Sequence, residues 1–211
     1  MKALNEFVLE KLKVAGSKHI YYPNSKEELV DLIIKEIEMN GPNCSLNHID
    51  VSNITDMSYL FRGGENINQV LNEFDGDISG WDVSNVTDMS FLFYFCYFNG
   101  KNGDISNWDV SNVTNMSYMF MGNKYNGDIS NWDVSNVTDM SSMFYSSTFN
   151  GDISNWDVSK VEQFKTMFKK SQFNGDISKW KINPKAQGNM QQMFESSPLA
   201  NTPPDWYYKY V

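Results

Sequence analysis

A tryptophan recurs at a nearly constant interval through most of this 211-residue chain. The intervals are 27, 24, 24 and 24 residues between Trp81, Trp108, Trp132, Trp156 and Trp180. Around them runs the pattern G-D-I-S-x-W-x-V-S-N-V-T-x-M-S-x-M-F, best preserved over 103–120, 127–144 and 151–168. A unit this short cannot bury its own apolar side chains, so its copies must stack to form one continuous core. The chain is therefore predicted to be a tandem-repeat solenoid.

The segment around each tryptophan is interpreted as a short β-strand. Trp108 and Val110 alternate with the polar Asn107 and Asp109, which is typical of a strand with one buried face. Equivalent strands one repeat apart would pair in parallel, about 4.8 Å apart. Because the alternation places tryptophan on the buried face, core packing is favoured over a row of sugar-binding rings.

The segment after each strand is interpreted as a short helix. Thr114 is a favourable N-cap residue, and Val113, Met116, Met119 and Phe120 follow at helical spacing. The fold class predicted is therefore an α/β repeat: a solenoid with a parallel β-sheet of about seven short strands, short helices and an N-terminal helical cap.

Both ends of such a stack need covers. Residues 1–43 are predicted to form the N-terminal helical cap, and residues 44–211 the solenoid with a C-terminal aromatic cap. In the first cap, a helix is expected to begin at Ser25, with Glu28 completing a capping box, and to end at Asn40-Gly41-Pro42. Its predicted buried face is Val30, Ile33, Ile34 and Ile37. An earlier helical stripe is expected at Leu4, Phe7, Val8 and Leu12, and the C-terminal lid at Trp206, Tyr207, Tyr208 and Tyr210.

Charge is unevenly spread along the chain. The net charge is −9, and residues 41–160 hold four basic and fifteen acidic side chains. An acidic middle repels nucleic acid and anionic lipid, and it suits a basic partner or a cation. No apolar stretch is long enough to cross a bilayer, and the first residues lack the apolar region of a signal peptide. Neither nucleic-acid binding nor membrane insertion is therefore expected.

Residues that could carry chemistry are few. His19 and His48 lie in no metal or triad pattern, and there is no phosphate loop or nucleophile elbow. Cys44 and Cys96 are too few for a disulfide framework and are expected to be small apolar residues. The Asn-Val-Thr triplets, such as the one at Asn112, are interpreted as a turn followed by an N-cap. We expect no enzyme, no cofactor and no metal.

Two rows of aspartates repeat with the unit. One row occupies a single strand position, at Asp50, Asp82, Asp109, Asp133 and Asp157. The other follows a glycine in each repeat, at Asp77, Asp104, Asp128, Asp152 and Asp176. In both rows the favoured interpretation is that each carboxylate accepts hydrogen bonds within a turn. For the first row, a basic protein partner and a Ca²⁺ site remain as alternatives.

The repeated block F-N-G-D-I-S-N-W-D-V-S-N-V-T-D-M-S-x-M-F resembles the BspA-like family over about residues 44–208. Members of that family are known from bacterial surface proteins, mycoplasma lipoproteins and gut bacteria. The resemblance implies a leucine-rich-repeat-like solenoid used for protein or surface binding, with no catalytic residues to carry over. The start of the chain lacks the export signal of the surface members. Leu4–Val8 is similar to short leaders of some phage-encoded proteins, so a cytoplasmic or virion-associated location is expected.

The expected function is a non-enzymatic scaffold that binds a protein through its acidic strand face. A basic protein is one alternative for this partner. The alternative function is a structural component of a larger assembly, such as a virion or a bacterial surface layer. The candidate partner-binding residues are Asn107, Asp109, Asn131, Asp133, Asn155, Asp157, Lys179 and Lys181. The two lysines reverse the charge at one end of the row, which would fix the direction of a partner.

Overall fold

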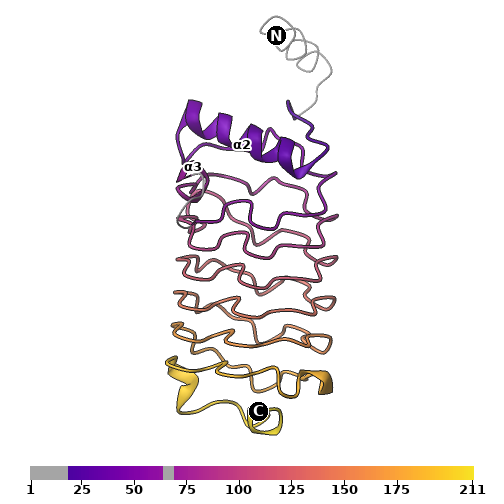
Figure 1. Ribbon diagram of the computed structural model, residues 1–211, viewed down its shortest axis with the longest axis vertical. Helices are drawn as coiled ribbons and strands as arrows, with labels where there is room; N and C mark the ends of the chain where they lie inside the picture. Colours follow the sequence, from indigo (N-terminus) through magenta and orange to yellow (C-terminus); the bar gives the residue numbers. More distant parts are fainter. Residues whose placement is uncertain (1–18, 64–68) are drawn as a thin grey trace, which may run out of the picture.

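The protein is a stack of coils, with one sequence repeat per coil (Figure 1). The computed structural model describes residues 19–63 and 69–211. Its helices are α2 (Lys26–Asn40), α3 (Gln69–Asn72) and the 3₁₀ helices η1 (Pro184–Ala186), η2 (Pro198–Ala200) and η3 (Tyr207–Lys209). Helix α2 lies across one end of the stack, and the C-terminus lies at the other. The stripe predicted at Leu4, Phe7, Val8 and Leu12 lies outside the described residues.

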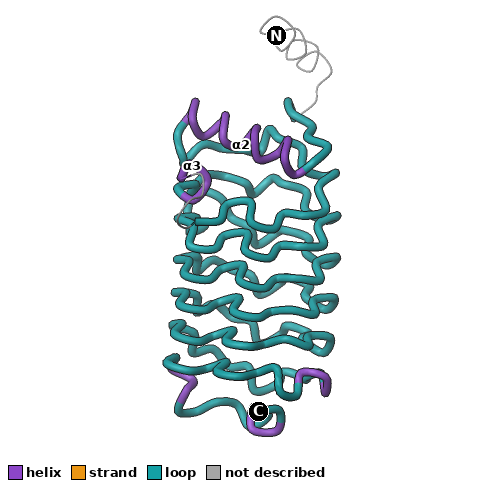
Figure 2. The backbone as a smooth tube through the Cα atoms, in the orientation of Figure 1, coloured by secondary structure: helices purple, strands orange, loops and turns teal. Residues whose placement is uncertain are grey.

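The predicted parallel β-sheet was wrong. The described residues form no strand (Figure 2), and successive repeats are joined instead by isolated parallel bridges, such as the one between Asp88 and Asn115. In the segment predicted as a strand, the Ser111 amide donates to the Asp109 carboxylate at 3.1 Å, and the Val113 amide donates to the Val110 carbonyl at 2.9 Å. These amides are used inside turns and cannot extend a ladder. The leucine-rich-repeat-like sheet of about seven strands is therefore not formed.

The short helix predicted after each strand was also wrong. The Ser117 amide donates to Asn115 Oδ1 at 3.0 Å, a side-chain turn that competes with helix formation. Tyr118 has a φ of 60°, in the left-handed region that an α-helix excludes. The Met116 amide donates to the backbone carbonyl of Asp139 in the next coil at 2.9 Å. The apolar spacing that suggested a helix arises here from consecutive three-residue turns.

The three coils that begin at Asp77, Asp104 and Asp128 are each built on three Asp-x-Ser or Asn-x-Ser turns. In one coil the acceptors are Asp104, Asp109 and Asn115, and each accepts the amide of the serine two residues later, at 2.9, 3.1 and 3.0 Å. The residue between acceptor and serine is apolar and buried, as at Ile105, Val110 and Met116. Three short polar motifs thus bend the chain and direct one side chain inward at each bend. The third of these motifs is the one that the sequence suggested was helical.

The predicted burial of the tryptophan row is confirmed. Trp132 is 3% exposed, and its indole N–H donates to the Ile105 carbonyl of the preceding coil at 3.1 Å. The same bond recurs at Trp156, which donates to Ile129 at 3.1 Å. The Asn112 side chain also donates to the preceding coil, to the Ser84 carbonyl at 2.7 Å, as a structural residue would. Indole and amide groups therefore fasten each coil to the one before it.

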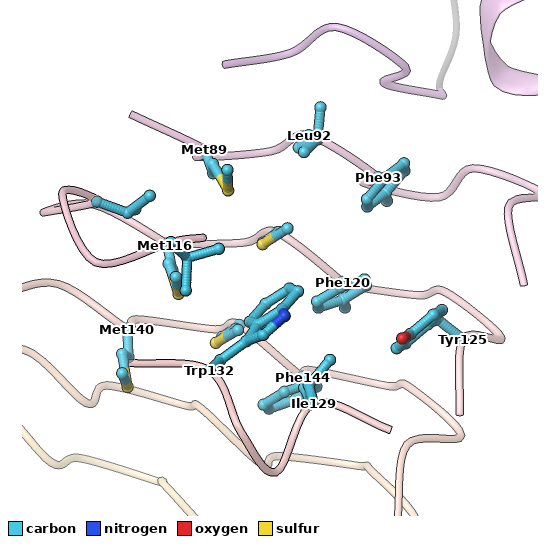
Figure 3. Close-up of a cluster of buried hydrophobic side chains, with 14 of the residues drawn as sticks. Met89, Leu92, Phe93, Met116, Phe120, Tyr125, Ile129, Trp132, Met140 and Phe144 are labelled. Atoms are coloured by element: carbon cyan, nitrogen blue, oxygen red, sulfur yellow. The ribbon is translucent and has the colours of Figure 1, made fainter. Parts of the chain in front are cut away.

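Behind the tryptophans, identical side chains stack in columns (Figure 3). Met89, Met116 and Met140 lie one above another, as do Phe93, Phe120 and Phe144. The phenylalanine ring centroids are 5.6 Å apart between the first pair and 5.8 Å apart between the second. Burial of these large rings removes apolar area from water and so stabilises the stack.

Helix α2 begins and ends where the sequence predicts. Ser25 accepts the Glu28 amide at 3.2 Å, and Gly41, with a φ of 84°, donates to the Ile37 carbonyl at 2.8 Å. The predicted buried face was partly wrong, because Val30 and Ile34 are only half-buried. The side chains that the helix buries are Leu29, Ile33, Glu36 and Ile37.

The opposite end of the stack is covered by aromatic residues. Trp206 continues the tryptophan row, with its ring centroid 6.3 Å from that of Trp180 and its indole N–H 2.9 Å from the Ile177 carbonyl. The Tyr210 hydroxyl donates to the Ile182 carbonyl at 3.3 Å. Tyr208 points away and is 69% exposed.

One hydroxyl in the core has no partner. Tyr125 is 1% exposed, its oxygen makes no hydrogen bond in the described structure, and burial raises the pKa of its phenol. Phe149 and Phe173 occupy the equivalent position in the next coils. We expect Tyr125→Phe to raise the free energy of unfolding by about 1 kcal/mol, because an unpaired buried hydroxyl is removed without a cavity. Urea denaturation measures this, with the exposed Tyr208→Phe as control; a loss of stability would mean that the hydroxyl is bonded.

Candidate functional site

The eight candidate residues lie on successive coils and are all exposed. They are Asn107, Asp109, Asn131, Asp133, Asn155, Asp157, Lys179 and Lys181. Each pair flanks a buried tryptophan of the row, whose indole bond to the preceding coil fixes the register. The structure therefore brings the eight residues together on one side of the stack, which we call the acidic strip. The surface consists of turns, whereas the sequence suggested a strand face.

Each aspartate of the acidic strip is held by the turn that it forms. The carboxylates of Asp109, Asp133 and Asp157 accept the amide of the following serine at 3.1, 3.0 and 3.0 Å. The Ser111 hydroxyl also donates to Asp109 at 2.6 Å. Hydrogen bonds from the serine side chain and amide lower the pKa values of Asp109 and Asp157. The turn-forming interpretation is thus confirmed for all three carboxylates, and Asp109 and Asp157 remain charged at neutral pH.

The charge of the acidic strip changes from negative to positive within one surface depression. Asn155, Asp157, Lys179 and Lys181 line a depression of about 300 Å³, together with Ser154, Trp156 and Ser159. Beside the bonds from Ser159, the Lys181 and Lys160 ammonium groups also lower the pKa of Asp157. An incoming group that carries both a cation and an anion would find complementary charges here.

The second aspartate row is held by the same kind of turn. Asp128, Asp152 and Asp176 each accept the amide of the serine two residues later at 2.9 Å, and this bond is the main cause of their lowered pKa values. Asp128 and Asp176 act in the opposite direction on Asp152, whose pKa their charges raise. The charges of the neighbouring aspartates therefore raise the pKa of Asp152, but the hydrogen bonds of its own turn lower that pKa by more.

These lowered pKa values predict acid lability. A carboxyl group whose folded pKa lies below its ordinary value of 3.8 stabilises the fold above that pH. The stabilisation is lost as the pH falls through the folded pKa. We expect the melting temperature to fall between about pH 5 and about pH 3, and to fall less in the Asp128→Asn, Asp152→Asn, Asp176→Asn variant, because an amide oxygen stays an acceptor in acid. Calorimetry across this range tests it; equal slopes for both proteins would contradict it.

The two histidines lie beside carboxylates near the N-terminal end of the stack. His19 lies 3.4 Å from the Asp50 carboxylate, and His48 lies 3.3 Å from Glu36. Both cysteines are free, and burial raises the pKa of Cys96 to about 12. Over residues 19–63 and 69–211, no three His, Cys, Asp or Glu side chains are grouped so that they could hold a metal ion. Within the same ranges, no helix is both long enough and apolar enough to span a bilayer.

One surface of the protein was not predicted from the sequence. Tyr59, Phe91 and Tyr118 follow Met-Ser in three successive coils, and Ser142 and Thr166 stand at the same repeat position in later coils. Tyr59 is 44% exposed, so its ring lies at the surface. The signal was available as a change from aromatic to polar residues at one repeat position. This change was not recognised as a signal because the segment was interpreted as a helix.

Stacked coils joined by inter-coil hydrogen bonds make this chain a tandem-repeat protein. Residues 38–103 and 95–206 match the family described as "Mycoplasma protein of unknown function, DUF285". The chain belongs to this family. No curated protein and no solved structure matches it.

Proposed function

We propose that the protein is a non-enzymatic repeat scaffold that binds a protein partner through the acidic strip. The observation that carries the proposal is the geometry of Asp109, Asp133 and Asp157, which are exposed on successive coils and oriented by turn hydrogen bonds. A row of fixed like charges attracts a partner with complementary basic groups and speeds its association. The lysine pair at Lys179 and Lys181 gives the strip a direction.

The resemblance to BspA-like proteins supports a binding role over catalysis, since it implies a surface used to contact proteins. The family match places the chain among repeat proteins without assigning an activity. Within this proposal the acidic strip is the working surface, and the buried tryptophan row only holds it in register.

A structural role in an assembly is the second candidate. Exposed apolar side chains occur towards both ends of the stack, with Met39 of α2 at 67% exposure and Tyr208 and Val211 at 69% and 62%. Such residues could join the ends of neighbouring subunits. A mass from light scattering that grows with concentration would support this role, and a constant monomer mass would argue against it.

The acidic strip is tested by reversing its charge. We expect Asp109→Lys with Asp133→Lys to abolish partner capture. The changes remove two turn acceptors and should lower the melting temperature, but the protein should still fold, because Lys181 holds the same repeat position in a later coil. A matched variant, Glu27→Lys with Asp31→Lys, makes the same charge change on α2, where both residues are also exposed. Capture from a host extract is quantified by mass spectrometry for the three proteins. Undiminished capture by a folded strip variant would show that the strip is not the binding surface.

A further inference from the structure

At one repeat position, three successive coils carry an aromatic residue that the fold does not require. The third turn of each coil places the residue before a buried Met or Leu in the left-handed region, where an L-residue is disfavoured by about 1–2 kcal/mol. The φ values are between 54° and 62° at Tyr59, Phe91, Tyr118, Ser142, Thr166 and Gln192. Serine and glutamine satisfy the same backbone position in later coils. The three aromatic side chains are therefore not required by the fold.

These rings form one partly exposed surface. Tyr59 and Phe91 stack with centroids 4.5 Å apart, and Phe91 and Tyr118 with centroids 4.3 Å apart. Phe95, 46% exposed, lies against Gly122, where an added Cβ would come within 2.3 Å of its ring. We call Tyr59, Phe91, Tyr94, Phe95 and Tyr118 the aromatic ridge. Because the rings of its main column face one another, they offer edges rather than open faces to a ligand.

The only arginine of the chain is held in this ridge. The Arg62 guanidinium lies 5.2 Å from the ring centroid of Tyr59, 5.9 Å from that of Phe91 and 5.5 Å from that of Tyr94. Its Nε is buried and makes no hydrogen bond, and no ion pair to Arg62 forms within the described part of the chain. Cation–π contacts thus orient a planar donor group without using its capacity to bind an anion.

We propose that the aromatic ridge with Arg62 is a second docking surface, which binds a polypeptide segment carrying an Asp or Glu beside an apolar side chain. The unpaired guanidinium matches a carboxylate in charge and in geometry. Ring edges carry partial positive charge and favour the same group. The exposed surface of Tyr59 and Phe95 suits the neighbouring apolar residue. A sugar, by contrast, would need open ring faces, which the stacked column does not present.

This surface is independent of the acidic strip. It lies on another segment of the coil, after the third turn, and it selects an acidic rather than a basic partner. The later coils, which carry Ser142, Thr166 and Gln192 at the same position, lack the aromatic residues and therefore mark the limit of the surface. The two surfaces together would let one chain join partners of opposite charge.

The test uses a displayed library of random linear peptides, selected on the full-length protein. We expect enriched peptides to share an Asp or Glu next to an aliphatic or proline residue. A synthetic peptide of the enriched sequence should lose at least about tenfold in affinity with Arg62→Gln, and also with Arg62→Lys, which keeps the charge but not the planar fork. Tyr118→Ser should weaken binding too, and it should fold, because Ser142 holds the same position in the next coil.

Two controls separate this surface from the rest of the molecule. Gln192→Ser changes the equivalent position far from the ridge and should leave peptide affinity unchanged, as should Asp109→Lys with Asp133→Lys in the acidic strip. Failure to enrich acidic peptides, or binding of an enriched acidic peptide that persists in folded Arg62→Gln and Tyr118→Ser variants, would overturn the proposal. Loss of binding in the strip variant alone would likewise assign the peptide to the strip.

Discussion

Replacement of Trp132 by alanine is expected to lower the free energy of unfolding by about 3–5 kcal/mol. The side chain is 3% exposed, its ring centroid lies 6.3 Å from that of Phe120, and its indole N–H is bonded to the Ile105 carbonyl. The change would open a cavity between coils and leave that carbonyl without its donor. Urea denaturation measures the effect, and the exposed Tyr208→Ala should change stability by no more than about 0.5 kcal/mol.

The position of the tryptophan along the stack adds a second comparison. In a repeat protein each unit contacts only its neighbours, so damage in the middle weakens two interfaces and damage at an end weakens one. Trp206, 8% exposed, stacks on Trp180 in the last coil. Trp206→Ala should therefore be milder than Trp132→Ala. Equal and small effects of both changes would show that the row is not the core.

Asn123→Ala is the second large effect that we expect, about 3 kcal/mol of unfolding free energy, because each buried group left unpaired costs about 1–3 kcal/mol. Asn123 is 1% exposed. Its amide donates to the Phe93 and Cys96 carbonyls at 3.2 and 2.8 Å, and its oxygen accepts the Tyr125 amide at 2.7 Å. Alanine would remove all three bonds from the interior.

Later coils of the same chain suggest a control for Asn123→Ala. Ser147 and Ser171 stand at the equivalent position of later coils, and the Ser147 hydroxyl accepts the Phe149 amide at 3.4 Å. Asn123→Ser should therefore be less destabilising than Asn123→Ala, since one acceptor remains. Thermal and urea unfolding of both variants measure the difference. If Asn123→Ala were as stable as the native protein, the hydrogen bonds of Asn123 would have no energetic role.

The sequence predicted which side chains are buried better than it predicted the backbone that buries them. Trp108 and Val110 alternate with exposed Asn107 and Asp109, as in a strand. A series of turns with an apolar residue at each bend produces the same alternation. Periodicity cannot separate the two, because it reports the direction of side chains and not the partners of the amides. The deciding information was the repeated Asp-x-Ser motif, which sends the serine amide to a side chain.

Helix α2 could be predicted because its boundaries carry local signals. Ser25, Glu28 and Gly41 form caps that need no knowledge of the rest of the chain. The left-handed residues gave no such signal, since Tyr118 and Thr166 are types that rarely adopt positive φ. They are held there by hydrogen bonds to the next coil, which sequence periodicity does not reveal.

The candidate surfaces, too, could be predicted only in part from the sequence. The positions of the acidic strip could be predicted because they repeat, and their exposure follows from the burial of the neighbouring tryptophans. The aromatic ridge could not be found by periodicity, because it departs from the repeat. Arg62 is a single residue whose surroundings come from two coils, with Tyr59 in its own coil and Phe91 and Tyr94 in the next.

The central claim is that the M-S-x-M-F segments form hydrogen bonds between coils and not within a helix. Scalar couplings across hydrogen bonds, measured by NMR on labelled protein, identify the acceptor of each amide. The structure predicts couplings from the Tyr118 amide to the Ser141 carbonyl and from the Phe120 amide to the Met143 carbonyl, where the N···O distances are 2.9 and 3.0 Å. A coupling from the Phe120 amide to the Met116 carbonyl would instead show a helix and contradict the account.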